Sequence, residues 1–329
     1  MVTKKVNMKA AVIRKWGNAE VFKIEEVSQP TPGPDQVLVK IFACSINPVD
    51  WKHRKGKHQY LLGAPFPIIL GYDICGEVIE AGSEIKHLNE GDIVFGDLDN
   101  KYGGGLAEYA LGTEQCFALK PTNVSIEQSA AVSLAGLTAL QALRDKAQLF
   151  KNQTVVINGA SGGVGHMAVQ IAKILQAKVI AVASGKNTSF LEQFSPDDIV
   201  DYTQQDILKI PFKADVFFDV IGNYSFLKTR HLLKPHGTYI STLPRPKILF
   251  HKLLQPFTRG KKVKTLLRKH SSSDLALLGK WMETGKLRIH IDRSFPLDKI
   301  AEAHAHSELG RTVGKSIIVI ATHEKETKK

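Results

Sequence analysis

The sequence predicts an α/β protein with two domains, an all-β, barrel-like domain and a doubly wound parallel sheet. Three observations predict this fold class. At 329 residues the chain is longer than one ordinary hydrophobic core requires. Residues 8–120 form short β-rich runs separated by turn residues, and from about residue 122 strands and helices alternate. With 43% hydrophobic and 23% charged residues, the composition is typical of a soluble globular protein.

The first part of the chain contains five short runs with strand-like composition. Turn-forming stretches such as "QPTPGPDQ" and "DNKYGGG" lie between them, which is typical of antiparallel barrels. The predicted strands are "MKAAVIRKW" (8–16), "QVLVKIFACSI" (36–46), "CGEVIEAG" (75–82), "DIVFG" (92–96) and "LAEYALG" (106–112).

The second part begins with a predicted helix over 125–145, with Ser125 as its cap. Alternating elements follow, which predict a parallel sheet covered by helices. We expect strands at 154–160, 178–184, 197–202, 214–222 and 237–243, and a helix at 162–176. The stretch 287–320 reads strand–helix–strand, and we expect it to return to the first domain.

The net charge of +12 is concentrated in one segment. Residues 244–270 carry nine Lys and Arg and no acid, which leaves +3 for the remainder of the chain. Three cysteines without a C-x-x-C pair argue against a disulfide framework. No apolar run is long enough to span a bilayer, and the N-terminus has no signal-peptide core. These features predict a cytoplasmic protein.

The strongest chemical signal is a glycine-rich turn in "VVINGASGGVGHMAVQIAK" (155–173). A buried-type strand runs into the turn, and a helix starts directly after it. Gly162 and Gly165 occupy the second and third glycine positions of G-x-G-x-x-G, with Ala160 at the first and with Ser161, Gly163 and Val164 between. Small residues there let a pyrophosphate approach the helix N-terminus, so the turn predicts dinucleotide binding.

The next strand indicates which dinucleotide. An acid that would bind the ribose 2′-hydroxyl of NAD is missing after "VIAVAS", where Ser184 and Lys186 stand and no acid follows until Glu192. A hydroxyl and a cation suit a 2′-phosphate, and Tyr202 could add a phenolic donor. The sequence therefore favours NADP(H) over NAD(H).

The motifs together resemble the zinc-independent quinone oxidoreductase branch of the medium-chain dehydrogenase/reductase superfamily. They are "INPVDWKHRKG", "GYDICGEVIEAG", "GDIVFG", "GGLAEYA", "AAVSLAGLTAL", "GASGGVG" and "GRTVGKSIIVI", in the family's order. "NPVDWK" is most similar to chloroplast-envelope quinone oxidoreductase homologues and alkenal/enone reductases. The resemblance implies a GroES-like β-barrel catalytic domain from residues 1–121 and 266–329, a Rossmann domain from 122–265, and an active site in the cleft.

The resemblance also implies that no zinc is bound. Asn47 stands at the family's cysteine ligand, Tyr72 at its histidine ligand and Leu134 near its third ligand, and this set cannot form a tetrahedral zinc site. Cys44 reads as a buried strand residue, and His53 and His58 lie among lysines and arginine that disfavour a metal cation.

Catalysis would then rest on hydrogen-bond donors that stabilise the developing oxyanion. By resemblance, Asn47 is expected near the nicotinamide, and Lys52 could offer charge or a proton to the substrate oxygen; a solvated rim lysine is the alternative. Tyr60 is a weaker candidate acid. Asp50 is expected to hold the local backbone rather than react. Further cofactor contacts implied by position are Thr138, Ile221, Gly222, Leu243 and Arg311.

Two functions remain open from the sequence. The favoured one is an NADPH-dependent, zinc-independent reductase of quinones or α,β-unsaturated carbonyls. The alternative is an NADPH-binding redox sensor or a membrane- or RNA-associated accessory protein with little catalysis. Segment 244–270 has amphipathic helical spacing, which fits cleft covering or peripheral contact with anionic lipid better than nucleic-acid binding. We expect a homodimer, as in relatives.

Overall fold

The computed structural model describes residues 6–57, 59–63, 66–242 and 260–322. The chain divides into two compact units. The first unit extends to Leu134 and also contains His270–Gly285 and the residues from Ile289 onward, and the second unit comprises Ala135–Lys269 and Lys286–Arg288. The domain boundaries expected from the sequence, 121/122 and 265/266, fall earlier in the chain. Over the described residues, no helix is both long and apolar enough to cross a membrane.

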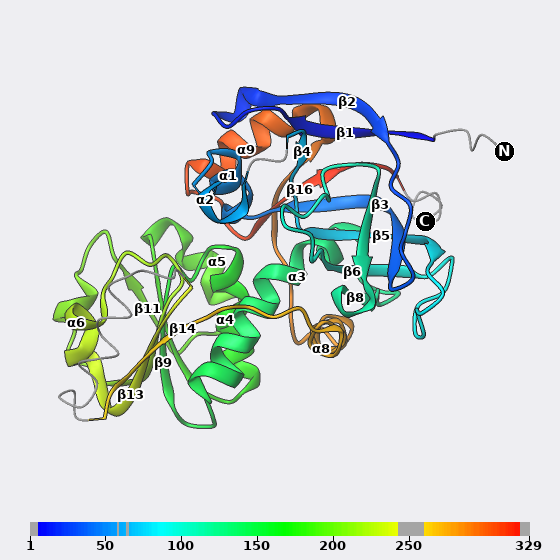
Figure 1. Cartoon of the computed structure of the whole chain (residues 1–329). Coiled ribbons are helices and arrows are strands. Elements are labelled where there is room, and N and C mark those ends of the chain that lie inside the picture. Colours follow the sequence, from blue (N-terminus) through cyan, green and yellow to red (C-terminus); the bar gives the residue numbers. More distant parts are fainter. Residues whose placement is uncertain (1–5, 58, 64–65, 243–259, 323–329) are drawn as a thin grey trace. The chain divides into compact units, whose positions relative to one another are not determined.

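The first unit is built on two sheets whose strands pair antiparallel except for the parallel pair β15 and β16 (Figure 1). A small sheet has the order β2-β1-β4, and a seven-stranded sheet has the order β15-β16-β3-β5-β6-β8, with β7 also paired to β3. The strands are β1 (Asn7–Ile13), β2 (Phe22–Ser28), β3 (Gln36–Ile46), β4 (Ile68–Ile69), β5 (Asp73–Ala81), β6 (Ile93–Asp97), β7 (Tyr109–Thr113), β8 (Phe117–Leu119), β15 (Ile291–Pro296) and β16 (Lys315–Val319).

Strand β3 is the centre of this unit because nearly all of its eleven residues are buried. Ile41 and Cys44 of β3 pack with Ile74 of β5 and Ile318 of β16 in one apolar core, in which each side chain is removed from water. Strand β16 pairs antiparallel with β3, with Ile318 opposite Cys44. The expected return of the 287–320 stretch to the first domain is thereby confirmed.

Among the described residues, five α-helices lie in the first unit or lead out of it: α1 (Pro48–Arg54), α2 (Gln59–Leu62), α3 (Ile126–Leu140), α8 (Ser272–Glu283) and α9 (Ile300–Glu308). Helix α3 carries the chain into the second unit and continues as a π-helix, Gln141–Ala147. Ser125 caps α3, since the Gln128 backbone N–H donates to Ser125 Oγ over 3.1 Å. This cap confirms the predicted helix start.

The second unit is a parallel sheet of six strands in the order β11-β10-β9-β12-β13-β14. The strands are β9 (Thr154–Asn158), β10 (Lys178–Ala183), β11 (Asp198–Asp201), β12 (Ala214–Asp219), β13 (Leu233–Ser241) and β14 (Lys262–Thr265). The α-helices in the described part of this unit are α4 (Gly163–Ile174), α5 (Thr188–Glu192) and α6 (Phe226–Thr229). The doubly wound parallel sheet predicted from the sequence is confirmed.

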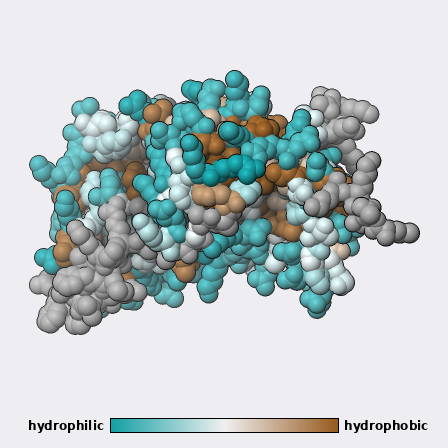
Figure 2. Space-filling view, turned by 45° about the horizontal axis from the view of Figure 1, so that its top comes forward, coloured by the Kyte–Doolittle hydropathy of each residue, from teal (hydrophilic) through white to brown (hydrophobic). Residues whose placement is uncertain are grey.

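Exposed large apolar side chains are scattered over both units. They include Tyr60, Phe150, Tyr202, Ile221 and Leu267, which belong to different elements. In the space-filling view, hydrophobic residues form small groups among hydrophilic ones on the face shown (Figure 2). Residues 244–259, which are most of the basic segment 244–270, lie outside the described residues, and so does the cofactor contact expected at Leu243.

Candidate active site

The glycine-rich turn of the second unit joins β9 to α4. Gly165 lies against the start of this turn, where an added Cβ would come within 2.0 Å of the Gly159 carbonyl oxygen. Gly162, the residue before the helix, faces open space, since an added Cβ would meet only that same oxygen at 3.6 Å. A close backbone approach and free space at a helix N-terminus are what a pyrophosphate requires, so the turn fits a dinucleotide.

The loop after β10 lies next to this turn. Asn187 donates from Nδ2 to Ser161 Oγ over 2.9 Å, which joins this loop to the glycine-rich turn. Ser184 is half-buried and Lys186 is exposed in the same loop. Tyr202 follows the neighbouring strand, and its side chain is 55% exposed. The predicted Ser184 and Lys186 therefore belong to a loop that Asn187 joins to the glycine-rich turn.

Asp201 is an acid in this region that sequence reasoning missed. It ends β11, and its Oδ1 accepts bonds from the backbone N–H and the hydroxyl of Thr203 at 2.9 and 2.7 Å. These bonds, with one from the Gly185 N–H, lower the pKa of the carboxyl. An added Cβ at Gly185 would lie 2.2 Å from Asp201 Oδ2. Asp201 therefore holds the loop that carries Ser184 and Lys186 through its contact with Gly185.

The loop after β12 is fixed by one buried carboxylate, Asp219. It accepts hydrogen bonds from the N–H groups of Gly222 (2.8 Å) and Tyr224 (3.0 Å) and from the Tyr239 hydroxyl (2.9 Å). Asn158 at the end of β9 also donates to it, over 2.7 Å. The carboxyl ends of β9 and β12, where ligands of such sheets bind, are thereby joined, and Ile221 is presented with its side chain 52% exposed.

Two further predicted cofactor contacts, Thr138 and Arg311, belong to different units. Thr138 is buried on α3 in the second unit. Arg311 is exposed, and it belongs to the first unit, just before β16.

In the first unit, Asn47 is the residue between β3 and α1, and its side chain belongs to a buried polar network. Its Nδ2 donates to Asp73 Oδ2 over 2.9 Å, and its Oδ1 accepts from Lys315 Nζ over 2.6 Å. Ser45 Oγ and the Leu134 backbone N–H donate to the Asp73 carboxylate as well, each over 2.7 Å. Lys315 is 3% exposed and lies 3.3 Å from Asp73 Oδ2, so the buried acid has a buried counter-charge.

This network does not fit a metal ion. The amide oxygen of Asn47 is already bonded to an ammonium, which would repel a second cation at the same atom. Tyr72 donates its hydroxyl proton to the Lys101 carbonyl over 2.8 Å and lies 3.2 Å from His53 Nδ1. Leu134 donates its backbone N–H to Asp73, and its aliphatic side chain carries no atom that could bind a metal. Within the described ranges, no three His, Cys, Asp or Glu side chains are grouped to hold a metal.

The predicted catalytic residues differ in how they are held. Lys52 on α1 is half-buried, and burial, with the charge of Lys57, lowers the pKa of its ammonium. Tyr60 on α2 is 95% exposed, so no packing orients its phenol. Asp50 accepts the Asn47 backbone N–H over 2.7 Å, as expected of a residue that holds the local backbone. Its burial raises the pKa of the carboxyl to about 7.

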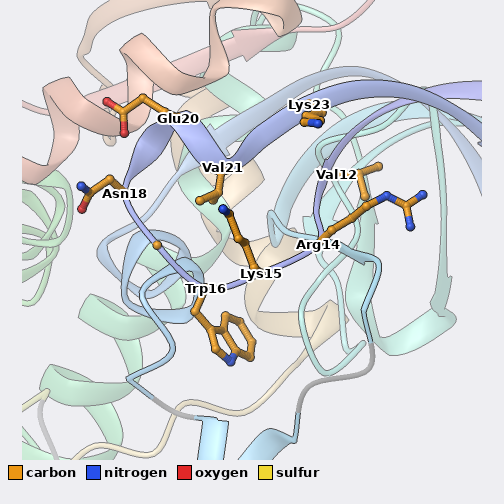
Figure 3. A pocket seen from close by; sticks show the side chains of 9 residues that line it. Val12, Arg14, Lys15, Trp16, Asn18, Glu20, Val21 and Lys23 are labelled. Carbon is orange, nitrogen blue, oxygen red and sulfur yellow. The ribbon is translucent and has the colours of Figure 1, made fainter.

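A cavity of about 550 Å³ lies elsewhere in the first unit, around the turn between β1 and β2. Its lining runs from Val12 to Lys23, and Figure 3 shows the Trp16 indole pointing away from Asn18 and Glu20. None of the predicted site residues belongs to this lining. We therefore do not assign the cavity to the chemistry of Asn47 and Lys52.

Sequence reasoning also missed Lys315 and Asp73 as partners of Asn47. The sequence does carry a signal for Lys315, because this lysine begins the apolar strand "GKSIIVI". A lysine buried with such a strand requires a partner of opposite charge. No sequence feature indicates which residue that partner is, because Lys315 and Asp73 are 242 residues apart.

Comparisons with known proteins agree with this architecture. The chain matches the family models of the alcohol dehydrogenase GroES-like domain over residues 33–122 and of zinc-binding dehydrogenase over residues 195–318. It is 35% identical over 312 residues to the chloroplast envelope quinone oxidoreductase homolog of Arabidopsis thaliana, which covers 92% of this chain and 95% of the relative.

Two further similarities concern activity and structure. The chloroplastic NADPH-dependent alkenal/one oxidoreductase of Arabidopsis thaliana is 33% identical over 322 residues, covering 94% of this chain and 79% of the relative. The solved quinone oxidoreductase from Coxiella burnetii superposes with a TM-score of 0.89 at 32% identity, covering 96% of this chain and 100% of that one. The chain therefore belongs to the medium-chain dehydrogenase/reductase superfamily, in the branch of the quinone and alkenal/one oxidoreductases, and is an oxidoreductase with a nicotinamide cofactor.

Proposed function

We propose that this protein is an NADPH-dependent, zinc-independent reductase of quinones or α,β-unsaturated carbonyl compounds. The observation that carries the proposal is the half-buried Lys52 on α1, close in sequence to an Asn47 whose amide oxygen is already taken by a buried ammonium. A site of this kind offers a positive charge without a metal. The names of two relatives, a quinone oxidoreductase homolog and an NADPH-dependent alkenal/one oxidoreductase, support the substrate class and the cofactor.

The cofactor, when bound, supplies the hydride. In the second unit, the Gly162–Gly165 turn would hold its pyrophosphate, and Ser184 and Lys186 would bind a 2′-phosphate. The charge of Asp201 opposes a 2′-phosphate, but its oxygens already accept bonds from Thr203 and Gly185, which reduces that repulsion. Measured preference for NADPH over NADH tests this balance directly.

Lys52 would act on the substrate oxygen. Hydride addition to a quinone or enone places negative charge on the carbonyl oxygen, and an ammonium in a partly desolvated position stabilises that charge more strongly than one in water. The lowered pKa of Lys52 also makes it a better proton donor than an ordinary lysine. Asn47, fixed by Asp73 and Lys315, would hold the surrounding backbone and amide in one orientation.

An oxidation assay tests the proposal. NADPH and NADH consumption is followed with 1,4-benzoquinones, 2-alkenals, enones and 2-enoyl thioesters. We expect turnover with NADPH, and a loss of about 100-fold in kcat/KM for Lys52→Ala. Lys52→Arg keeps the charge but cannot give up its proton at neutral pH. Activity of Lys52→Arg close to that of the wild type would therefore assign charge stabilisation to Lys52, and activity as low as that of Lys52→Ala would assign proton donation. Lys299→Ala, at an exposed lysine of the same unit, is the matched control.

Two outcomes would contradict the proposal. Activity of Lys52→Ala within about twofold of the wild type would remove Lys52 from the mechanism. Tight NADPH binding without turnover of any acceptor would favour the sensor or accessory role. That role rests on segment 244–270, of which residues up to 259 lie outside the described part of the chain. A homodimer, a cytoplasmic location and peripheral membrane contact stay predictions, testable by sedimentation, fractionation and vesicle binding.

A further inference from the structure

Three lysines surround one tryptophan at the end of α1. The Nζ atoms of Lys52, Lys55 and Lys57 lie 5.4, 5.6 and 5.5 Å from the centroid of the Trp51 ring. At these distances each ammonium is attracted by the π-electrons of the indole. We call Trp51 and these three residues the lysine cluster.

The backbone at the helix end explains why the lysines meet. The Lys57 N–H donates to the Lys52 carbonyl over 3.0 Å, and the Gly56 N–H donates to the His53 carbonyl over 2.7 Å, which together form a Schellman motif. Gly56 has φ +71°, the left-handed conformation that such a motif needs. This reversal folds the chain back, so that the backbone of Lys57 lies next to the carbonyl of Lys52, five residues earlier.

The positive charge of the cluster is only partly balanced. Glu308 of α9 pairs with Lys55, and it also pairs with the buried guanidinium of Arg54. Lys52 and Lys57 have no carboxylate within ion-pair distance among the residues that the structure describes. The charge of Lys57 instead disfavours the protonated form of Lys52, since like charges repel. An anion placed between them would relieve this repulsion.

The geometry points to a small anionic group rather than to a nucleic acid. Single strands bind by stacking bases on exposed aromatic rings, but ammonium groups already occupy positions around the Trp51 ring. Lysines act as point charges, which suits a carboxylate or phosphate. Lys52 is also the residue proposed to act on the substrate carbonyl. An anion bound at Lys57 would therefore belong to the same substrate molecule.

We propose that the lysine cluster binds a carboxylate or phosphate group of the substrate, so that the preferred acceptor is an α,β-unsaturated carbonyl compound that carries a negative charge. This inference rests on the proposed reductase function and narrows its substrate class. Lys52 would act on the carbonyl end, and Lys57, with Lys55 beside it, would bind the charged end.

A matched pair of substrates tests the inference. One is an enone whose alkyl chain ends in a carboxylate, and the other is its methyl ester, of equal reactivity at the alkene. We expect kcat/KM to be about five- to tenfold higher for the carboxylate in low salt, as for a partly exposed charge contact. The ratio of the two values should fall toward one in Lys57→Gln and in about 0.5 M NaCl. Lys299→Gln removes one exposed charge elsewhere and should keep the wild-type ratio.

The outcomes separate this inference from the proposed function. Equal kcat/KM for both enones, or a preference that survives in Lys57→Gln, would overturn the inference while the reductase function stands. If neither these enones nor any quinone is reduced, the proposed function fails, and calorimetric titration of NADP⁺-saturated protein with each enone decides the inference. Tighter binding of the carboxylate, lost in Lys57→Gln, supports the cluster, and equal binding refutes it. Binding of a single-stranded oligonucleotide that depends on Lys57 would assign the cluster to nucleic acid instead.

Discussion

Asp50 is a buried acid at the first turn of α1, and burial raises the pKa of its carboxyl to about 7. The hydrogen bond from the Asn47 backbone acts in the opposite direction but is outweighed. In the unfolded chain the ordinary value of 3.8 applies. Between these two values the folded protein holds a proton that the unfolded chain releases, so folding stability falls as pH rises through this range and becomes constant above about pH 7.

The substitution Asp50→Asn isolates this effect. The amide oxygen can still accept the Asn47 N–H, but the side chain no longer titrates. We expect the wild type to lose stability relative to Asp50→Asn by at most about 1.4 kcal/mol per pH unit up to about pH 7. Urea unfolding of both proteins between about pH 5 and pH 8 measures the difference. A difference that does not change with pH would show that Asp50 is ionised throughout.

At the same scale, the position of Asn47 could be predicted and its partners could not. The "INPVD" motif indicated that residue 47 carries an amide where a metal ligand would otherwise stand. That this amide is held between Asp73 and Lys315 follows from the pairing of β3 with β5 and β16, which no local pattern encodes. For Tyr60, in contrast, the residue type suggested a role that its surroundings do not support. Its residue type suited an acid, but exposure depends on packing that one sequence does not show.

Helix ends offer a matched pair for testing local structure. Gly56 after α1 and Gly285 after α8 both follow the helix cap, with φ of +71° and +69°. An added Cβ at Gly285 would meet nothing within 4 Å, whereas one at Gly56 would lie 2.9 Å from Cγ of Trp16. Of these two glycines, only Gly56 is required both by its backbone conformation and by the lack of space for a Cβ.

We expect Gly285→Ala to cost about 1 kcal/mol of unfolding free energy, the usual penalty for a left-handed alanine. Gly56→Ala should cost about 2–3 kcal/mol, because the Trp16 ring must also move. Urea denaturation of both variants measures the two costs. Equal losses of unfolding free energy in the two variants would mean that the Trp16 indole moves aside at no cost. The left-handed conformation of the Schellman motif would then be the whole reason for a glycine at position 56.

Elements were predictable where composition and packing agree. Strand β3 has the predicted bounds, 36–46, because its apolar run is buried on nearly every residue. Strand β2 was missed, since "FKIEEVS" is mostly polar and only its first residue is fully buried. Helix α1 was also missed as a helix. It has seven residues, begins with Pro48, and depends on its cap rather than on periodicity.

At the scale of the whole molecule, the donor set predicts how the protein handles metal. Elemental analysis of purified protein should find zinc well below one ion per chain, and NADPH oxidation should be unchanged after treatment with a chelator. The reason is the Lys315 ammonium at the Asn47 oxygen and the absence of a three-ligand group in the described residues. Stoichiometric zinc, with activity lost on its removal, would contradict the proposed mechanism.

The pairing of Lys315 with Asp73 has a consequence for the order in which the two units fold during synthesis. Translation delivers β3 and β5 first, then all of the second unit, and only afterwards β16 with Lys315. Until that residue leaves the ribosome, the Asp73 carboxylate has no ammonium to neutralise it, and β3 lacks one neighbouring strand. The described sheet of the second unit, β9 to β14, is complete earlier. Nascent chains should therefore fold the second unit before the unit that carries Asn47 and Lys52.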